Sequence, residues 1–481
     1  MVSLGFLYPE MALTIGLLIL IVIGLVVKNG NVAWLCSFII LIANLIFLIF
    51  EGPVEKPIPL FGGMLKASAF SFYLRALIVF AGILVVVLSN PKSVRKNPFE
   101  YFGFVLAIIL GAELLVMSEH LAMVILNLEL MSIPAYVLAG YAFDKHSSEA
   151  SLKYFIYGST ATAFMIFGFS WLYGLSETMI FTSLGFAEKL KFNDTEVFLV
   201  AGLMALAGLL FKMAATPFHF WAPDVYQSTP MPVLVLFSTI PKIAAGSVLI
   251  KFLTAFGLNG GTRYDWQSMA AILAMVTLTI GNFSALWQTN AKRLMAYSSI
   301  GQAGFLLVAV ATLTSNSNKV FFFYSTVLVL STVLVFLALE LFEREYQTKE
   351  LPDFQGLGKV RPFKAVMLLI GMLSLVGLPI TAGFTAKLFL FSGLLEAWSA
   401  TGKDVLVWLF GFGLLNTVVS LYYYLRIPYF LFLKEPKDIH PSNKKPIFSL
   451  VLAAMLAVAL LWLFFQPDSL MGWINRISFG L

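Results

Sequence analysis

Four ionisable side chains lie deep within hydrophobic segments of the chain: Glu129, Lys212, Lys242 and Lys387. An ionisable group at the centre of a bilayer costs about 2.5–3.5 kcal/mol on insertion scales, so four such groups require an explanation. Intramembrane ionisable residues usually mark a path for ions or protons. We therefore take these four residues as the candidate carriers of a proton.

Lysine suits a proton relay, whereas arginine does not, because arginine stays protonated. Burial lowers the pKa of a lysine from about 10.4 by up to about 3–5 units, and a nearby carboxylate raises it again. We expect Glu129 to pair with Lys212 and to hold it protonated until the pair is disturbed. Lys242, which follows Pro241, would receive the proton through ordered water, and Lys387 would be the terminal donor or acceptor. In the competing, structural interpretation, the carboxyl group of Glu129 binds a neighbouring helix for stability alone. The lysine side chains then extend so that their ammonium groups lie at the membrane–water interface.

Five further charged residues have weaker claims to a functional role. Glu113 and Arg75 would pair with each other or with a neighbouring subunit, and we favour a structural role for both. Glu340 lies near the end of a predicted helix, and a solvated or interfacial position explains it as well as a functional role does. Lys292 and Arg293 begin a predicted span, where basic residues commonly serve as interfacial anchors.

The composition identifies an integral membrane protein, since 60% of the 481 residues are hydrophobic and only 12% are charged, against about 25% charged residues in soluble domains. The single cysteine, Cys36, excludes a cysteine-ligated iron–sulfur cluster or zinc–thiolate site within this chain alone. Four scattered histidines do not suggest paired haem ligation. No Walker loop, dinucleotide-binding glycine motif or HExxH motif occurs. We therefore expect no metal or cofactor site in this chain, and no nucleic-acid partner.

The hydrophobic windows long enough to cross a bilayer predict an all-α polytopic membrane protein with about fourteen transmembrane helices. The N-terminus lacks the basic region of a signal peptide, so the first window is expected to be a retained span. The predicted spans are 9–28, 32–50, 68–89, 98–117, 119–141, 150–175, 196–226, 230–256, 266–287, 291–313, 319–343, 363–398, 404–430 and 446–465.

Two of these windows, 196–226 and 363–398, are too long for one straight helix, and each contains a proline near a lysine. Pro217 and Pro379 remove a backbone donor and predict a helix broken at mid-membrane. His219 and Asp224 follow the first break and are expected to brace it rather than to shuttle protons. Two broken, lysine-bearing helices point to inverted repeats. The predicted organisation is helices 1–3 in 1–97, a first five-helix repeat in 98–256, an inverted second repeat in 266–430, and helix 14 with a tail in 446–481.

The distribution of basic residues predicts the orientation of the chain. Loops after odd-numbered spans carry most of the lysines and arginines outside the spans, which would make these loops cytoplasmic and place both termini on the outer side. The residues that carry this bias are Lys92, Arg95, Lys96, Arg344, Lys349, Lys359, Arg361, Lys364, Lys434, Lys437, Lys444 and Lys445.

Over about 90–460, these residues and their neighbours resemble the antiporter-like subunits of respiratory complex I, and in particular the subunit N family of NADH-quinone oxidoreductase. The form Trp221-Ala-Pro-Asp-Val-Tyr226 resembles subunit N rather than its paralogues L and M, and the chain lacks the long lateral helix expected of subunit L. The resemblance rests on the segments 128–138, 148–155, 212–227, 241–244, 292–300 and 377–387.

The resemblance implies that Glu129 and Lys212 match the family's Glu–Lys pair, Lys242 the connecting lysine, and Lys387 the lysine on the second broken helix. It implies a non-redox, proton-translocating subunit in the membrane of a bacterium, driven by quinone reduction elsewhere in the complex. NADH, FMN, iron–sulfur clusters and quinone would then be bound by partner subunits. Other membrane subunits, including antiporter-like paralogues, are the expected partners.

One position departs from the family pattern. After Tyr297-Ser-Ser-Ile-Gly301, where the family pattern usually has histidine, this chain has Gln302, which cannot exchange a proton near neutral pH. Tyr297, His219 and Gln302 are therefore secondary candidates, either in the relay or in its support. A water chain bonded by Gln302 would replace the histidine, or the path would avoid this span.

Two other classes of protein remain open at this stage. An independent cation/proton antiporter subunit of the multi-subunit type would use the same relay residues without any link to a redox enzyme. A structural membrane subunit would use its buried charges only to pack helices. Association with flavin- and cluster-bearing subunits would distinguish a complex I subunit from an independent antiporter subunit. Intact pumping without Lys212 or Glu129 would support a structural membrane subunit.

Overall fold

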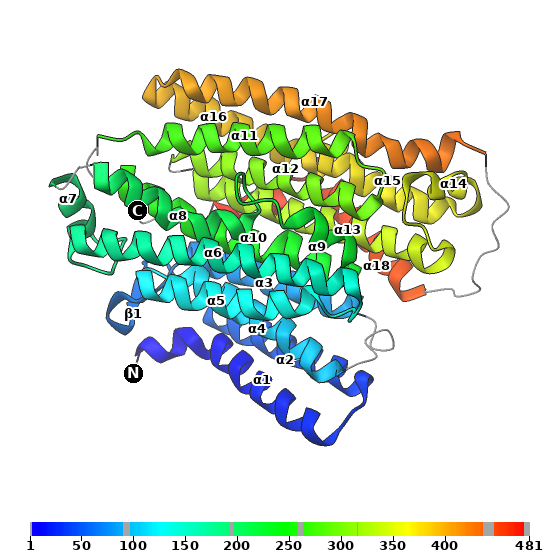
Figure 1. Ribbon diagram of the computed structural model, residues 1–481, viewed down its shortest axis with the longest axis horizontal. Coiled ribbons are helices and arrows are strands. Elements are labelled where there is room, and N and C mark those ends of the chain that lie inside the picture. The colour runs from blue at the N-terminus through cyan, green and yellow to red at the C-terminus, as the bar shows by residue number, and fades with distance from the viewer. Residues whose placement is uncertain are drawn as a thin grey trace. The chain divides into compact units, whose positions relative to one another are not determined.

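The computed structural model describes residues 2–89, 97–192, 196–257, 263–314, 316–435 and 447–475, and these are almost entirely helical. They form two compact units. The first unit comprises the described residues up to 214 and those of 240–269, and the second comprises 215–239 and the described residues from 270 onward. Figure 1 labels the elements along the chain.

The first unit contains a short hairpin and most of the helices of the N-terminal half. The hairpin pairs two antiparallel strands, with Ile58 opposite Ala67, and short 3-10 turns lie at Val2–Leu7 and Phe61–Gly63. The elements are α1 (Tyr8–Val26), α2 (Gly30–Glu51), β1 (Ile58–Leu60), β2 (Leu65–Ala67), α3 (Ala69–Leu88), α4 (Pro98–Met117), α5 (Leu121–Ala139), α6 (Lys145–Ser176), α7 (Leu184–Phe192), α8 (Glu196–Met213) and α10 (Met231–Gly257), the last from Ile240 onward.

The second unit contains helices joined by turns and loops, and no strand of a sheet lies among its described residues. One 3-10 turn, Leu351–Phe354, precedes α14. The helices are α9 (Ala222–Ser228), α11 (Trp266–Leu286, from Ala270 onward), α12 (Ala291–Thr312), α13 (Ser317–Tyr346), α14 (Leu357–Val360), α15 (Pro362–Val376), α16 (Ala382–Thr401), α17 (Asp404–Leu433), α18 (Ile447–Phe465) and α19 (Asp468–Ile474).

The predicted fold class is confirmed. Among the described residues, 13 helices are long and apolar enough to cross a membrane. They correspond to all the predicted windows but one, and the remaining window, 363–398, is occupied by α15 and α16. The boundaries of the two repeats stay a prediction, and within the predicted segment 446–481 the residues 446 and 476–481 lie outside the described part.

The predicted orientation of the termini also stays a prediction. Half of the basic residues behind it lie outside the described residues, namely Lys92, Arg95, Lys96, Lys437, Lys444 and Lys445.

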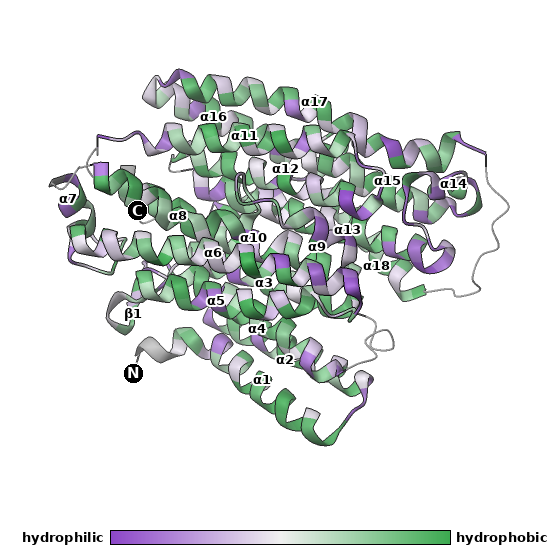
Figure 2. Cartoon of the chain, viewed as in Figure 1, coloured by the Kyte–Doolittle hydropathy of each residue, from purple (hydrophilic) through white to green (hydrophobic). Residues whose placement is uncertain are grey.

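Most of the described helices carry hydrophobic residues on all faces, as expected of spans that contact either lipid or other helices. Figure 2 shows α1 and α17 as mainly hydrophobic, and both expose large apolar side chains such as Leu25 and Val418. In contrast, the membrane-spanning part of α10 is buried along its whole length. The inner helices are therefore the ones on which a buried polar group needs a protein partner.

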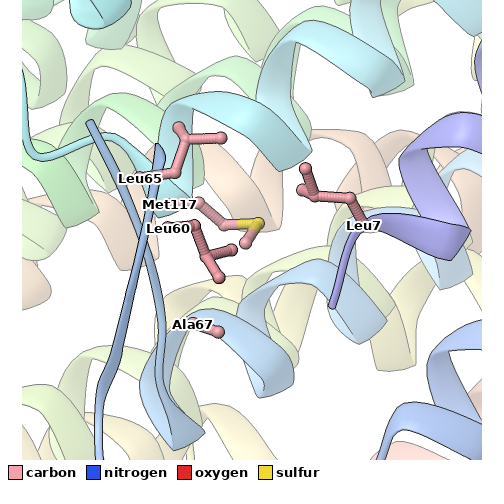
Figure 3. Packing of buried hydrophobic residues seen from close by; sticks show 5 residues of the cluster. All are labelled: Leu7, Leu60, Leu65, Ala67 and Met117. Carbon is pink, nitrogen blue, oxygen red and sulfur yellow. The ribbon is translucent and has the colours of Figure 1, made fainter. Parts of the chain in front are cut away.

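A small apolar cluster closes one end of the first unit. Leu60, Leu65 and Ala67 of the hairpin pack with Leu7 and with Met117 at the end of α4 (Figure 3). The backbone joins the same elements, since Glu119 donates its N–H to the carbonyl of Met64 at 3.0 Å. The hairpin thus fixes the loop between α4 and α5.

Close packing of α6 on α8 depends on Gly168. A Cβ atom at this position would lie 2.4 Å from the backbone nitrogen of Ala205 and 2.6 Å from the carbonyl oxygen of Ala201. Both obstacles are backbone atoms of a helix, so neither can turn aside. The missing side chain is what allows the two helices to approach.

We predict that Gly168→Ala lowers the stability of the protein by about 1–3 kcal/mol, the usual cost of overpacking a tight contact. Gly174→Ala on the same helix is the matched control, because a Cβ at Gly174 meets nothing within 4 Å. The measurement is the thermal unfolding midpoint of the purified variants. Equal midpoints for the two variants would contradict the predicted contact.

Candidate proton-carrying site

The first predicted break is present and follows directly after Lys212. Helix α8 ends at Met213, and the next residue, Ala214, has a φ of 56°, a left-handed conformation that cannot continue the helix. Pro217 lies in the turns that separate α8 from α9. Lys212 is therefore in the last turn of a helix, where a positive charge is favoured by the partial negative charge of the unpaired carbonyls.

The ammonium group of Lys212 is buried among aromatic rings. The side chain is 3% exposed, and Nζ lies 5.3 Å from the ring centroid of Tyr136, 5.5 Å from that of Tyr154 and 5.7 Å from that of Phe211. Nζ makes no hydrogen bond to any described residue. Cation–π attraction of this kind contributes about 0.5–2 kcal/mol, far less than full hydration of an ammonium ion.

The aromatic surroundings of Lys212 depend on a glycine. The rings of Tyr136 and Tyr154 meet edge to face, with centroids 4.8 Å apart. A Cβ at Gly158 of α6 would lie 1.9 Å from the hydroxyl oxygen of Tyr136. Gly158 therefore leaves the space into which this phenol enters.

Glu129 lies on α5, and its carboxylate accepts a hydrogen bond from Thr162 Oγ1 of α6 at 2.7 Å. It also acts on Lys212 electrostatically, although Nζ has no hydrogen-bond partner. The two groups therefore belong to one neighbourhood without a direct hydrogen bond. The predicted switching of this pair stays a prediction.

Lys242 is fully buried in α10, directly after Pro241, and α10 continues through that proline as one helix. The other end of α10 is anchored by Lys251. Its Nζ pairs with Glu119 Oε1 at 2.8 Å and donates to the carbonyls of Val116 and Ser118 at 2.8 and 3.1 Å. This contact ties the helix that carries Lys242 to the loop that precedes α5.

The second predicted break is also present. Helix α15 ends at Val376, and Gly377 follows with a φ of 85°. The N–H of Leu378 reaches back to the carbonyl of Leu373 at 3.1 Å, which closes a Schellman-type end. Pro379 lies between this end and Ala382, where α16 begins.

Lys387 closes the broken end from the opposite side. Its Nζ donates to the carbonyl oxygen of Val376 at 2.6 Å and lies 3.5 Å from Thr417 Oγ1. It also lies 4.0 Å from the ring centroid of Phe305. The side chain passes Gly377, where a Cβ would lie 2.7 Å from Lys387 Cδ. The ammonium group thus binds the negative end of a half-helix, as cations do at helix C-termini.

Gln302 is held in a buried hydrogen-bond network next to the same helix end. Its Nε2 donates to the carbonyl of Leu375 at 3.0 Å and to the hydroxyl of Tyr424 at 3.1 Å. Its Oε1 accepts from the hydroxyl of Tyr324, and Ser298 bonds Tyr424. Gln302 and Lys387 therefore bind the last two carbonyls of α15.

The remaining candidates lie in the second unit. His219 is buried, with Nδ1 3.4 Å from Thr216 Oγ1, and Tyr297 is half-buried on α12. Asp224 of α9 forms an ion pair with Arg293 of α12 at 3.1 Å. This pair braces the segment after the first break, in the role that the sequence suggested for Asp224.

Glu340 and Lys292 have nearby partners in α13. Glu340 pairs with Arg344 one turn further along the helix, and Lys292 pairs with Glu343 at 3.1 Å. For Glu340 the sequence left a solvated or interfacial position open, whereas the structure buries this side chain beside Arg344.

Sequence reasoning did not find the aromatic residues around Lys212 or the tyrosines that bond Gln302. Tyr136 lies seven residues after Glu129, a spacing that places both on one face of a helix and was available as a signal. Tyr154, Tyr324 and Tyr424 carry no such signal, because they come from other helices.

The apolar spans and the two broken helices define an antiporter-like polytopic membrane subunit. Residues 118–414 match the NADH:quinone oxidoreductase/Mrp antiporter transmembrane family. The chain is 34% identical to NADH-quinone oxidoreductase subunit N of Chlorobium chlorochromatii, over 100% of this chain and 96% of that protein. It is 36% identical to subunit N 1 of Solibacter usitatus, over 94% and 93% of the two chains. The chain belongs to the subunit N family of NADH-quinone oxidoreductase.

Solved structures agree with this assignment. A chain of respiratory complex I from Thermus thermophilus, solved with bound aureothin, has a TM-score of 0.82 and 29% identity, covering 98% of this chain and 100% of that one. A chain of the Mrp complex from Dietzia sp. has a TM-score of 0.84 at 19% identity, covering 99% and 97%. The second likeness concerns the fold alone.

Glu119 supplies a pH-dependent contribution to stability. Burial alone would raise its pKa, but the ammonium groups of Lys251 and Lys66 outweigh burial and hold the pKa of this carboxyl below its usual value. A carboxyl group with a lowered pKa stabilises the fold above its unfolded pKa of about 4.3, and this contribution is lost as the pH falls through the lower folded value.

We predict that Glu119→Gln destabilises the protein at pH 7 by about 2 kcal/mol, since a hydrogen bond to a charged group is lost. The difference from the wild type should shrink as the pH is lowered below about 4.3, because the carboxyl group of the unfolded wild-type chain then binds a proton more readily than that of the folded protein. The measurement is the thermal midpoint of both proteins between pH 7 and pH 3, with the exposed Glu188→Gln as control. A difference that does not vary with pH would contradict the ion pair.

Proposed function

We propose that this chain is a proton-translocating membrane subunit of NADH-quinone oxidoreductase. It couples quinone reduction elsewhere in the complex to the movement of protons through Glu129, Lys212, Lys242 and Lys387. The observation that carries the proposal is Lys212, a buried lysine beside a helix break whose Nζ has no hydrogen-bond partner among the described residues. Such a group has no evident use in packing.

Lys212 has surroundings suited to releasing a proton. Aromatic faces stabilise its ammonium form only modestly, and the carboxylate of Glu129 is held by Thr162 rather than by Nζ. Movement of the carboxylate towards Nζ would stabilise the charged form, and movement away would favour release. A change of a few kilocalories per mole at this position corresponds to several pKa units, at about 1.36 kcal/mol per unit.

Lys387 has surroundings suited to holding a proton. The carbonyl of Val376 accepts a short hydrogen bond from Nζ, and the end of α15 adds the negative pole of a half-helix. We therefore infer that protons enter from the cytoplasm to Lys212, pass through Lys242 towards Lys387, and leave on the outer side. Each charge moved against 100 mV costs about 2.3 kcal/mol, so the energy must come from redox chemistry in partner subunits.

The proposal extends to the partners of the chain. NADH, FMN, iron–sulfur clusters and quinone would be bound by other subunits, and other membrane subunits, including antiporter-like paralogues, would contact this one in a bacterial plasma membrane. The relatives named subunit N, at 34% and 36% identity, support this assignment. Copurification with flavin- and cluster-bearing subunits and NADH-quinone activity would test it directly.

We predict that Lys212→Met slows proton transfer through this subunit by at least about 100-fold, the lower end of the usual contribution of general acid–base catalysis. Lys212→Arg should have a similar effect, because arginine stays charged. The measurement is proton pumping per NADH oxidised, in vesicles reconstituted with the whole complex. Total pumping should fall by the share that this subunit contributes.

Lys153→Met is the matched control, since this lysine is 43% exposed on α6 and pairs only one turn away with Glu149. Assembly of each variant complex is checked before pumping is compared. Full pumping in assembled complexes with Lys212→Met and with Glu129→Ala would favour the structural-subunit alternative and refute the relay.

Gln302 is best explained as a fixed support for the second break, since its amide makes three hydrogen bonds to described residues. We predict that Gln302→Leu destabilises the protein by about 1–3 kcal/mol, because it leaves buried polar groups unpaired. Pumping by the assembled variant should slow without a shift of its pH profile, since an amide does not titrate. A shifted profile in this variant would instead place Gln302 in the titrating path.

A further inference from the structure

Buried charges also occur on α1 to α4, on residues other than those assigned to the relay. Arg75 of α3 is fully buried. Its guanidinium binds Glu10 of α1 through Nε at 2.7 Å and Nη2 at 3.0 Å. It binds Glu51 of α2 through Nη1 at 2.8 Å and Nη2 at 3.0 Å. One cation thus holds two carboxylates, instead of the Arg75–Glu113 pair that the sequence suggested.

A third acid, Glu113 of α4, completes this cluster. It is 0% exposed, and its Oε2 accepts a hydrogen bond from Asn44 Nδ2 of α2 at 3.1 Å. The same Nδ2 donates to the carbonyl of Pro9 at 2.9 Å. Two buried oxygens, Glu113 Oε1 and Asn44 Oδ1, have no hydrogen-bond partner among the described residues.

The charges in this cluster do not balance if every acid is ionised. Arg75 offsets one of the two carboxylates that bind it, so an ionised Glu113 would add a second uncompensated negative charge inside the membrane. An isolated carboxylate in such a medium is strongly disfavoured, and the usual outcome is neutralisation of the group. Glu113 therefore needs a positive partner that the cluster itself does not contain.

The other neighbouring helix does not supply this partner. Helix α5 packs on the opposite side of α4, where Met131 and Asn127 fill the space beside Gly111. The acid that α5 carries, Glu129, bonds Thr162 of α6. The charged groups that act on Glu113 are Glu10, Arg75 and Glu51.

We propose that Glu113 is a buried proton-binding site, which holds one proton as a neutral carboxylic acid beside the Glu10–Arg75–Glu51 cluster. A proton on Glu113 removes the second uncompensated negative charge with no further ligand, and leaves the one that Glu10 and Glu51 share around Arg75. A hard metal cation would instead require about six oxygen ligands, whereas Glu113 Oε1 and Asn44 Oδ1 are the two side-chain oxygens of the described cluster that have neither a hydrogen bond nor an ion pair. The site is distinct from the relay, and its existence does not depend on pumping through Lys212.

Glu113→Gln tests the site, because glutamine has the shape of the neutral acid. Infrared absorption of the whole complex in membranes at pH 7 should lose the intensity of one protonated carboxyl group in Glu113→Gln. Glu100→Gln on the same helix is the matched control, since Glu100 is exposed and should lose none. Asn44→Leu should shift the band without removing it, because the hydrogen bond to Oε2 is lost.

Stability provides a second, independent measurement. Glu113→Gln should leave the thermal midpoint within error of the wild type, whereas Glu10→Gln and Glu51→Gln should lower it, because they break the ion pairs of Arg75. Three outcomes would overturn the proposal: an unchanged infrared band in Glu113→Gln, a failure of that variant to assemble while Glu100→Gln assembles, or a wild-type midpoint that rises with Na⁺ and loses this dependence in Glu113→Gln. The last would indicate a bound metal cation.

Discussion

The absence of water in the bilayer interior is the constraint on which this structure depends, because every backbone polar group there must find a partner within the protein. An unbroken helix meets this requirement by itself, whereas a broken one leaves carbonyls exposed at its end. At the end of α15 the two last carbonyls are bound by side chains, Leu375 by Gln302 and Val376 by Lys387. The break is thus stable because the side chains of a lysine and a glutamine complete it.

The two lysines next to the breaks have different surroundings. Lys387 donates to a carbonyl at a helix end, so its charge is matched by a strong acceptor. Lys212 faces aromatic rings and has no hydrogen-bond partner among the described residues. The difference follows from local chain geometry. Gly377 lets the Lys387 side chain reach back to α15, while Gly158 lets Tyr136 come close to Lys212.

Sequence reasoning predicted the features that depend on local composition. Hydrophobic length identified the spans, and prolines close to buried lysines identified both helix breaks. It did not identify the partners of the buried charges, because these depend on which helices pack together. The Arg75 contacts to Glu10 and Glu51 join residues that are 65 and 24 positions apart, and no periodicity encodes such a choice. The roles of Glu129, Lys212, Lys242 and Lys387 remain to be tested.

Gln302, at the position where the sequence resemblance led us to expect a histidine, has a consequence for the electric field in the second unit. An amide carries the same dipole at every pH at which the protein is folded, and its orientation is fixed by bonds to Leu375, Tyr424 and Tyr324. The carbonyl end of α15 and the amide bound to it therefore present Lys387 with an electrostatic potential that does not vary with pH. Any change in the charge of this lysine must then originate in groups other than Gln302.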